Sequence, residues 1–218
     1  MYSGKTTWLN MELTNLADTS FRCLKIIHVD DQRTDVASAN VDGSTHNSTF
    51  QSISDRVTVV RTATLTDVDV RSYHVIGIDE AQFYPDLLDT VQKWVAAGKH
   101  VRVVGLDGDF MMRKFGQILD LVPLADQAEK MSAKCKLCLQ ELEGNAYKGN
   151  IFAIVGGFTC KINGNLGAQK EVGGADKYIP VCRYHHSMSS NTSTVISDVA
   201  TTVTIAISDN GDPQCTAS

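Results

Sequence analysis

Two short cysteine and histidine motifs place the strongest constraint on how this chain can fold. Cys135-x-x-Cys138 and Cys182-x-x-His185 each put two metal ligands on one tight turn. Four such ligands can converge tetrahedrally on one Zn²⁺ ion, so the chain between the two motifs is expected to close on itself. Four protein ligands leave no open position for water, which indicates a structural ion. The alternatives are His186 in place of His185, or buried thiols that bind no metal.

The composition is that of a globular protein with an acidic balance. The 218 residues are 43% hydrophobic and carry a formal net charge of −5, which suits one sizeable core plus a small additional unit. The charge argues against a nucleic-acid-binding surface, since such a surface normally carries a basic excess. No apolar run could span a bilayer and no signal peptide is recognised, so we expect no membrane partner and a cytoplasmic location. Cytosolic reductants would keep the six cysteines as thiols, which favours metal binding over disulfides.

Apolar runs typical of buried strands alternate with helical patterns in the first part of the chain. Runs rich in β-branched residues predict strands at 21–29, 57–60, 73–78 and 100–106. Apolar residues at helical spacing predict a helix over 7–16, and a second over 86–97 that Gly98 ends. Because strands and helices alternate, we predict an α/β fold with a parallel sheet.

Composition changes along the chain divide it into three parts. A stretch at 34–55 is rich in Ser, Asn, Asp and Thr and predicts a surface loop. After about residue 133 the sequence turns to cysteines, glycines and short strand-like pieces such as 158–162. The Ser/Thr-rich end is expected to be largely disordered, although VATTVTIAI could pair as a strand. We therefore predict domains at 1–132 and 133–188, followed by a tail at 189–218.

The chain opens on Ser3-Gly4-Lys5-Thr6, which matches the second half of a phosphate-binding loop. In such a loop backbone N–H groups wrap the phosphates, the lysine bridges the terminal ones, and the hydroxyl holds Mg²⁺. The tripeptide Gly-Lys-Thr also occurs in ordinary turns before helices, so other motifs must support this interpretation.

Two adjacent carboxylates follow the strand predicted at 73–78. Asp79 and Glu80 stand where an open α/β sheet places its ligand site. Adjacent side chains diverge at the end of a strand, so Asp79 can face the loop motif and its Mg²⁺ while Glu80 faces a substrate hydroxyl. A pair of solvated acids is the alternative, and the upstream loop motif weakens it.

Five segments together resemble the cytosolic type II thymidine kinase family, in order and at nearly the expected separations: MYSGKTT, IGIDEAQF, GLDGDFMMRKFGQILDLVPLAD, CKLC and VGGADKYIPVCRYHH. The resemblance covers residues 1 to about 186. It implies a P-loop NTPase-like α/β domain joined to a small zinc-binding domain, whose lasso loop closes over the nucleoside. It also implies a homotetramer that transfers phosphate from ATP to the 5′-hydroxyl of thymidine, giving dTMP for DNA precursor synthesis.

The resemblance implies roles for individual residues. ATP and Mg²⁺ would be held by Ser3, Gly4, Lys5, Thr6, Asp31, Arg33, Asp79 and Gln82. Glu80 would be the catalytic base that takes the proton of the 5′-hydroxyl. Thymidine would be held by Leu106, Phe110, Phe115, Thr159 and Tyr178, and by the lasso backbone at Gln169, Lys170, Glu171, Val172 and Gly173. Backbone groups of the lasso suit the N3 donor and O4 acceptor of thymine, a pattern that cytosine reverses.

Two features depart from the family pattern. The family's initial strand and the opening Gly-Pro of its loop are absent, which removes backbone donors to the phosphates and a partner strand. We therefore expect a truncated chain that folds poorly and is inactive as it stands. The segment 145–157 looks inserted, either as a lineage-specific loop or as translated intron. The alternatives to an active thymidine kinase are an inactive homologue that regulates active subunits, or a kinase for another deoxynucleoside.

Overall fold

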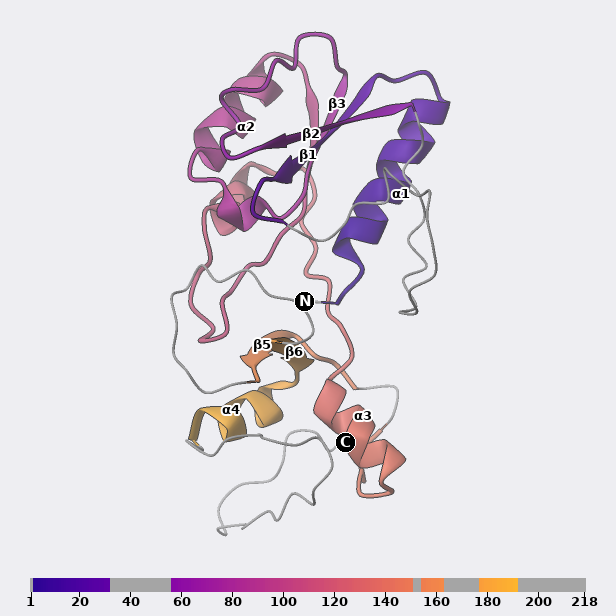
Figure 1. Ribbon diagram of the computed structural model, residues 1–218, viewed down its shortest axis with the longest axis vertical. Helices are drawn as coiled ribbons and strands as arrows, with labels where there is room; N and C mark the ends of the chain where they lie inside the picture. Colours follow the sequence, from indigo (N-terminus) through magenta and orange to yellow (C-terminus); the bar gives the residue numbers. More distant parts are fainter. Residues whose placement is uncertain (1, 32–55, 151–153, 163–176, 192–218) are drawn as a thin grey trace. The chain divides into compact units, whose positions relative to one another are not determined.

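The computed structural model describes residues 2–31, 56–150, 154–162 and 177–191 (Figure 1). The chain divides into two compact units. The sheet unit comprises Gly4–Asp107 and Lys114–Glu129. The cysteine unit comprises Gly108–Arg113, the described residues from Lys130 onward, and residues 2–3.

A parallel four-stranded sheet in the order β2-β1-β3-β4 forms the centre of the sheet unit. Its strands are β1 (Cys23–His28), β2 (Val57–Thr62), β3 (Val75–Ile78) and β4 (His100–Val103). Its helices are α1 (Lys5–Asp18), α2 (Leu87–Ala96) and the short 3₁₀ helices η1 (Ala81–Phe83) and η2 (Ile118–Leu124). The α/β fold with a parallel sheet that the sequence predicts is confirmed.

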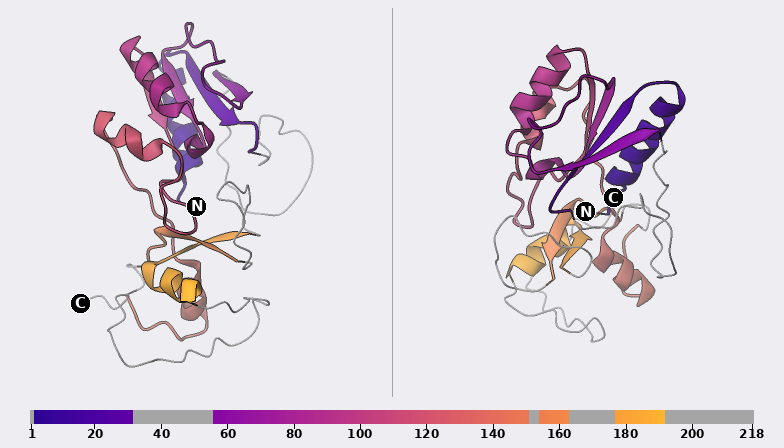
Figure 2. Two further views of the ribbon diagram at one scale, coloured as in Figure 1. Left: turned by 90° about the vertical axis from the view of Figure 1, so that its left-hand side faces the viewer. Right: turned by 45° about the horizontal axis from the view of Figure 1, so that its top comes forward.

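The two faces of the sheet pack against different helices. Figure 1 and the two further views of Figure 2 show the sheet lying between α1 and α2. Leu24 and Ile26 of β1 belong to a core cluster with Trp94 of α2. Cys23, which alternates with them, belongs to a second cluster with Leu13 of α1. This alternation explains why all six residues of β1 are buried.

Gly77 of β3 allows α1 to pack closely on the sheet. A Cβ atom built there would lie 2.6 Å from Cδ1 of Leu13 and 3.1 Å from Cδ1 of Leu9. A larger residue would therefore push the helix away. Because α1 starts at Lys5, this contact anchors the helix that carries the loop motif.

The strand predicted at 100–106 is shorter in the structure. The ladder of β4 with β3 ends at Val103 because β3 itself ends at Ile78. Val104 still donates its N–H to the carbonyl of Ile78 at 2.9 Å, and its own carbonyl accepts the N–H of Ala81 at 3.0 Å. The chain then leaves the sheet beside the residues that follow β3.

Two short strands and two helices make up the regular structure of the cysteine unit. They are α3 (Lys136–Glu143), β5 (Phe158–Lys161), β6 (Tyr178–Val181) and α4 (Arg183–Asn191), with β5 and β6 antiparallel. Within the segment 145–157, Ile154 and Gly156 contact other residues of this unit. Ile154 is 3% exposed and lies in the core cluster, and Gly156 donates its N–H to Ala133 at 2.7 Å.

Within the described part of the chain, no helix is long and apolar enough to cross a membrane. The loop predicted at 34–55, and all of the predicted tail beyond residue 191, lie outside the described residues.

Candidate functional site

The loop motif lies at the amino end of α1. Gly4 caps the helix in the left-handed conformation, with φ 78°, and its carbonyl accepts the N–H of Trp8 at 2.8 Å. Open space surrounds the position of its missing Cβ, so the backbone angle is what favours glycine there. Lys5 and Thr6 follow in the first turn, and both are half-buried, as is Ser3. Free N–H groups and the positive end of the helix dipole at such a terminus favour a phosphate.

Asp79 connects this helix to the end of β3. Its Oδ1 accepts the Thr6 hydroxyl at 3.2 Å and the backbone N–H of Glu80 at 3.0 Å. Asp79 is 3% exposed, so its carboxylate is removed from bulk water. The structure thus brings together Thr6 and Asp79, which are 73 residues apart in the sequence.

Lys25 of β1 is a site residue that our sequence reasoning missed. Its Nζ lies 3.3 Å from Oδ2 of Asp79, and both side chains are 4% exposed. A lysine within the apolar run from Cys23 to Ile27 was the available signal, because a buried lysine needs a partner. Periodicity alone does not identify that partner.

Glu80 turns the chain sharply after β3. It adopts the left-handed conformation with φ 48°, which costs a residue other than glycine roughly 1–3 kcal/mol. Its carboxylate accepts the side-chain amide of Gln82, whose Oε1 in turn accepts the N–H of Leu106 at 2.9 Å. Gln82 is 4% exposed. The side-chain amide of Gln82 therefore links Glu80 to the residues that follow β4 and fixes the direction of the Glu80 carboxylate. The predicted contact of Gln82 with the nucleotide stays a prediction.

Two buried side chains, Asp31 and Tyr84, lie near the end of β1. Asp31 is 5% exposed, and its carbonyl accepts Arg61 Nη1 at 2.8 Å. Burial raises the pKa of the Tyr84 hydroxyl, the carboxylates of Asp79, Asp86 and Asp31 raise it further, and Arg61 lowers it. Arg61 and Lys25 therefore offset part of the negative charge of these carboxylates.

The residues predicted to bind thymidine fall in both units. In the cysteine unit the rings of Phe110 and Tyr178 lie 6.3 Å apart at 35°, and Thr159 of β5 is buried. In the sheet unit Phe115 packs edge-to-face on Phe83 at 5.7 Å. The remaining predicted site residues lie outside the described residues: Arg33, Gln169, Lys170, Glu171, Val172 and Gly173.

Phe110 sits in a loop with well-defined contacts. Asp109 accepts the N–H groups of Met111 and Arg113 at 2.9 Å and forms an ion pair with the Arg113 side chain at 2.9 Å. His186 Nε2 lies 2.8 Å from the carbonyl of Phe110, so this nitrogen donates. The loop is thereby attached to the helix that carries the second metal motif.

The four predicted zinc ligands meet in one cluster. Their ligand atoms all lie within 4.8 Å of one another. The sulfur atoms of Cys135, Cys138 and Cys182 are each 3.4 Å from His185 Nδ1, and those of Cys138 and Cys182 are 3.9 Å apart. A tetrahedral zinc site requires about 3.5 Å and about 3.8 Å for these separations, given Zn–S of about 2.3 Å and Zn–N of about 2.0 Å. The donor set therefore fits Zn²⁺, with His185 rather than His186 as the fourth ligand.

The surroundings of the cluster shift the pKa values of its ligands. Burial raises the pKa of the Cys135 thiol, but hydrogen bonds from His185 and from the backbone outweigh burial and lower this pKa to about 6. Burial and the neighbouring Cys135 raise the pKa of Cys138. Burial lowers the pKa of His185, whereas Cys135 and Glu141 raise it, to about 9 overall. Glu141 accepts from His185 Nε2 at 2.9 Å, which leaves Nδ1 for the metal.

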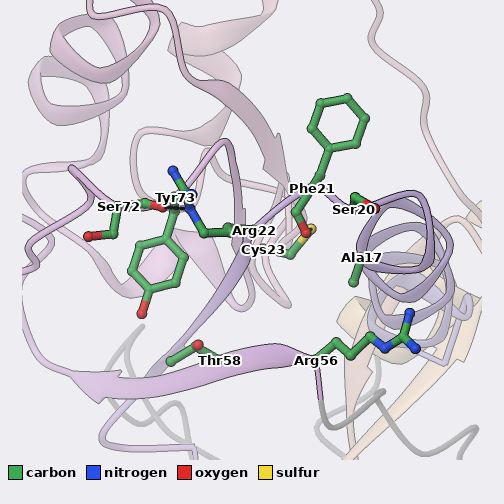
Figure 3. Close-up of a pocket in the computed structure, with 9 residues that line it drawn as sticks. All are labelled: Ala17, Ser20, Phe21, Arg22, Cys23, Arg56, Thr58, Ser72 and Tyr73. Carbon is green, nitrogen blue, oxygen red and sulfur yellow. Dashed lines mark hydrogen bonds between the residues drawn. The ribbon is translucent and has the colours of Figure 1, made fainter.

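A cavity of about 480 Å³ lies away from these residues (Figure 3). It is lined by Arg22 and Cys23 at the start of β1 and by Arg56 and Thr58 at the start of β2. Asp79 follows the carboxyl end of β3, and the strands are parallel. The cavity is therefore at the opposite end of the sheet and takes no part in the site.

Comparisons with known proteins agree with the arrangement of these motifs. The family described as "Thymidine kinase" matches residues 1–186. The cytosolic thymidine kinases of Bos taurus and Gallus gallus are each 36% identical over 190 residues, covering 84% of this chain and 67% and 71% of their own lengths. The thymidine kinase of Myxoma virus (strain Lausanne) is 33% identical over 185 residues, covering 84% of this chain and 89% of its own.

Proposed function

Because this chain belongs to the thymidine kinase family, we propose that it transfers the γ-phosphate of ATP to the 5′-hydroxyl of thymidine, giving dTMP and ADP. The observation that carries the proposal is the convergence of Thr6, Asp79 and Glu80 at the end of β3. Phosphoryl transfer needs mainly positioning and charge neutralisation from a protein, and this arrangement can supply both.

The nucleotide would be held at the amino end of α1. The ammonium group of Lys5 would neutralise the terminal phosphates, and backbone N–H groups of the first turn would bind their oxygens. Thr6 and Asp79 offer a hydroxyl and a buried carboxylate, the oxygen donors that suit Mg²⁺. When bound, that ion neutralises charge that develops on the transferred phosphoryl group.

Glu80 would act as the general base. Its carboxylate follows the strand that ends beside the nucleotide residues, and the amide of Gln82 fixes its direction. A base in this position accepts the proton of the 5′-hydroxyl as the oxygen attacks phosphorus. Such a group contributes about 10²- to 10⁴-fold to the rate.

The residues proposed to contact thymidine occur in both units, and we describe them for each unit by itself. Phe110, Thr159 and Tyr178 of the cysteine unit, and Leu106 and Phe115 of the sheet unit, would contact the nucleoside. The aromatic side chains at Phe110 and Phe115 support this role, because aromatic rings pack well against a planar base. The lasso backbone at 169–173 would read the base edge.

Zinc would hold the cysteine unit together without taking part in the reaction. Three cysteines and His185 would fill its coordination sphere, and the buried cluster supports a structural ion. We further propose that the protein is a homotetramer and is located in the cytoplasm. Relatives named as cytosolic thymidine kinases support the location. Light scattering of the purified protein tests the oligomeric state.

Transfer of labelled phosphate from ATP to thymidine tests the reaction. The proposal predicts turnover by the wild-type chain, whereas the missing first half of the loop predicts an inactive one, so this assay decides between the two expectations. The proposal also predicts a loss of kcat of about a hundredfold or more for Glu80→Gln. Glu12→Gln is the matched control, because Glu12 on α1 forms an ion pair with Arg102 on β4 and is assigned no role in the site. Deoxyuridine and deoxycytidine in parallel assays define the substrate range.

The outcomes separate the competing functions. A wild-type chain that transfers no phosphate would contradict the proposal and favour an inactive homologue that regulates other subunits. Faster turnover of another deoxynucleoside would keep the chemistry and replace the substrate. Equal rates for wild type and Glu80→Gln would remove Glu80 from the mechanism.

A further inference from the structure

Lys25 is a buried charge at the centre of the proposed nucleotide site. The residue is 3% exposed, lies in the middle of β1, and is surrounded in sequence by apolar residues. A buried ammonium group is costly unless an anion compensates it. A lysine serving only to pack this strand would be replaced at no loss by an apolar residue, so its charge calls for an explanation.

The sheet register explains how Lys25 reaches Asp79. Lys25 pairs with Gly77 on the neighbouring strand, and Asp79 lies two residues beyond Gly77 on the same face. Gly77 has no side chain, and α1 packs against this position through Leu13. The stem of Lys25 therefore runs beside α1 toward the end of β3, where Nζ lies 3.3 Å from Oδ2 of Asp79.

The two oxygens of Asp79 have different partners. Oδ2 faces Lys25, whereas Oδ1 accepts from the Thr6 hydroxyl and from the N–H of Glu80. Rotation of this carboxylate would break the contacts of both oxygens together. The contact with Lys25 thus sets the orientation that Thr6 and Glu80 require.

We propose that Lys25 is a positioning residue for phosphoryl transfer: its ammonium group holds Oδ2 of Asp79 and thereby keeps Oδ1 between Thr6 and the backbone of Glu80. The inference rests on the proposed function in that Thr6 and Asp79 support the Mg²⁺ of bound ATP. Lys25 acts through Asp79 and contacts neither substrate. Its loss should therefore weaken the coupling between Mg²⁺ and ATP, beyond any effect on folding.

The test measures that coupling directly. The dissociation constant of a fluorescent ATP analogue is determined with excess Mg²⁺ and with a chelator, and the ratio of the two values is compared between variants. This ratio does not depend on the amount of folded protein, so a purely structural role would leave it unchanged. We expect Lys25→Met to reduce the ratio by about tenfold or more, the range for loss of a group that orients a metal ligand.

Further variants separate a positioning role from instability. Removing one partner of a buried ion pair destabilises a protein strongly, so Lys25→Gln, which keeps a polar end, serves if Lys25→Met does not fold. Asp79→Asn should reduce the ratio as well, and Lys25→Met with Asp79→Asn should reduce it no further. Lys99→Met is the control, because Lys99 donates to the carbonyls of Arg71 and Tyr73 near the amino end of β4.

Each outcome of these measurements either supports or overturns the proposed role of Lys25. A wild-type ratio in whichever Lys25 variant folds, a wild-type ratio close to one, or multiplicative losses in the double variant would overturn the inference. Thymidine phosphorylation is measured on the same preparations. Absence of phosphorylation with a Lys25-dependent ratio would contradict the proposed reaction alone, whereas active variants with an unchanged ratio would contradict the role of Lys25 alone.

Discussion

Neutralising Glu141 should weaken zinc binding although Glu141 does not touch the metal. Its Oε1 lies 2.9 Å from His185 Nε2, and this contact holds the imidazole ring so that Nδ1 faces the three sulfur atoms. Glu141→Gln keeps the shape of the side chain but removes the charge that strengthens the hydrogen bond. The imidazole then becomes a weaker and less well-oriented ligand.

The size of the effect follows from the position of Glu141. Losing such an outer partner costs about 10- to 100-fold in metal affinity, which corresponds to about 1.4–2.7 kcal/mol. The Glu141 side chain is 32% exposed, so solvent screens part of its charge. We therefore expect a loss near the lower limit, about tenfold.

Competition with a chromogenic zinc chelator near neutral pH measures the change. Glu143→Gln on the same helix α3 is the matched control, because Glu143 is exposed and the substitution changes the net charge equally. The control should release zinc at the same chelator concentration as wild type. If Glu141→Gln also did so, the hydrogen bond to His185 would have no part in tuning the metal, and our reasoning would be refuted.

Three other perturbations give distinct results. Gly77→Ala should destabilise the protein by about 1–3 kcal/mol in urea unfolding, because the new Cβ would lie 2.6 Å from Leu13; an unchanged unfolding midpoint would show that α1 moves aside at little cost. Gly105→Ala should lower kcat, because its Cβ would lie 2.6 Å from Oε1 of Gln82 and displace the amide that orients the proposed base Glu80; a kcat equal to that of wild type would argue that this amide is dispensable. Zinc affinity should fall as the pH is lowered below about 9, where protons compete for His185, and more steeply below about 6, where they also compete for the Cys135 thiolate; a flat profile down to pH 5 would contradict the assigned ligand set.

Much of the fold was accessible from local patterns. Strands β1 and β3 were predictable because continuous apolar runs mark strands buried on both faces. Strand β2, at the edge of the sheet and only partly buried, was predictable from its β-branched residues. The shortening of β4 was not predictable, since it depends on where the neighbouring strand β3 ends. The packing of Ile154 into the cysteine unit was also hidden, because a segment that looks inserted carries no signal of its tertiary contacts.

The sequence by itself identified the residues of the zinc cluster and of the proposed nucleotide site. Ligand spacing at Cys135-x-x-Cys138 and Cys182-x-x-His185 restricts geometry over a few residues, so the metal ligands and the choice of His185 over His186 could be predicted. The residues Thr6 and Asp79 were likewise recognised from motifs whose residue types have few other uses.

Only the tertiary structure decided which groups orient these residues. Lys25 reaches Asp79 through the register of two strands, and Glu141 reaches His185 from another helix. Such contacts depend on the pairing of faces between distant segments, whereas periodicity reports only which face of one segment is buried. The groups proposed to react and to bind metal could therefore be recognised in the sequence, and the partners that hold them in place became visible only in the fold.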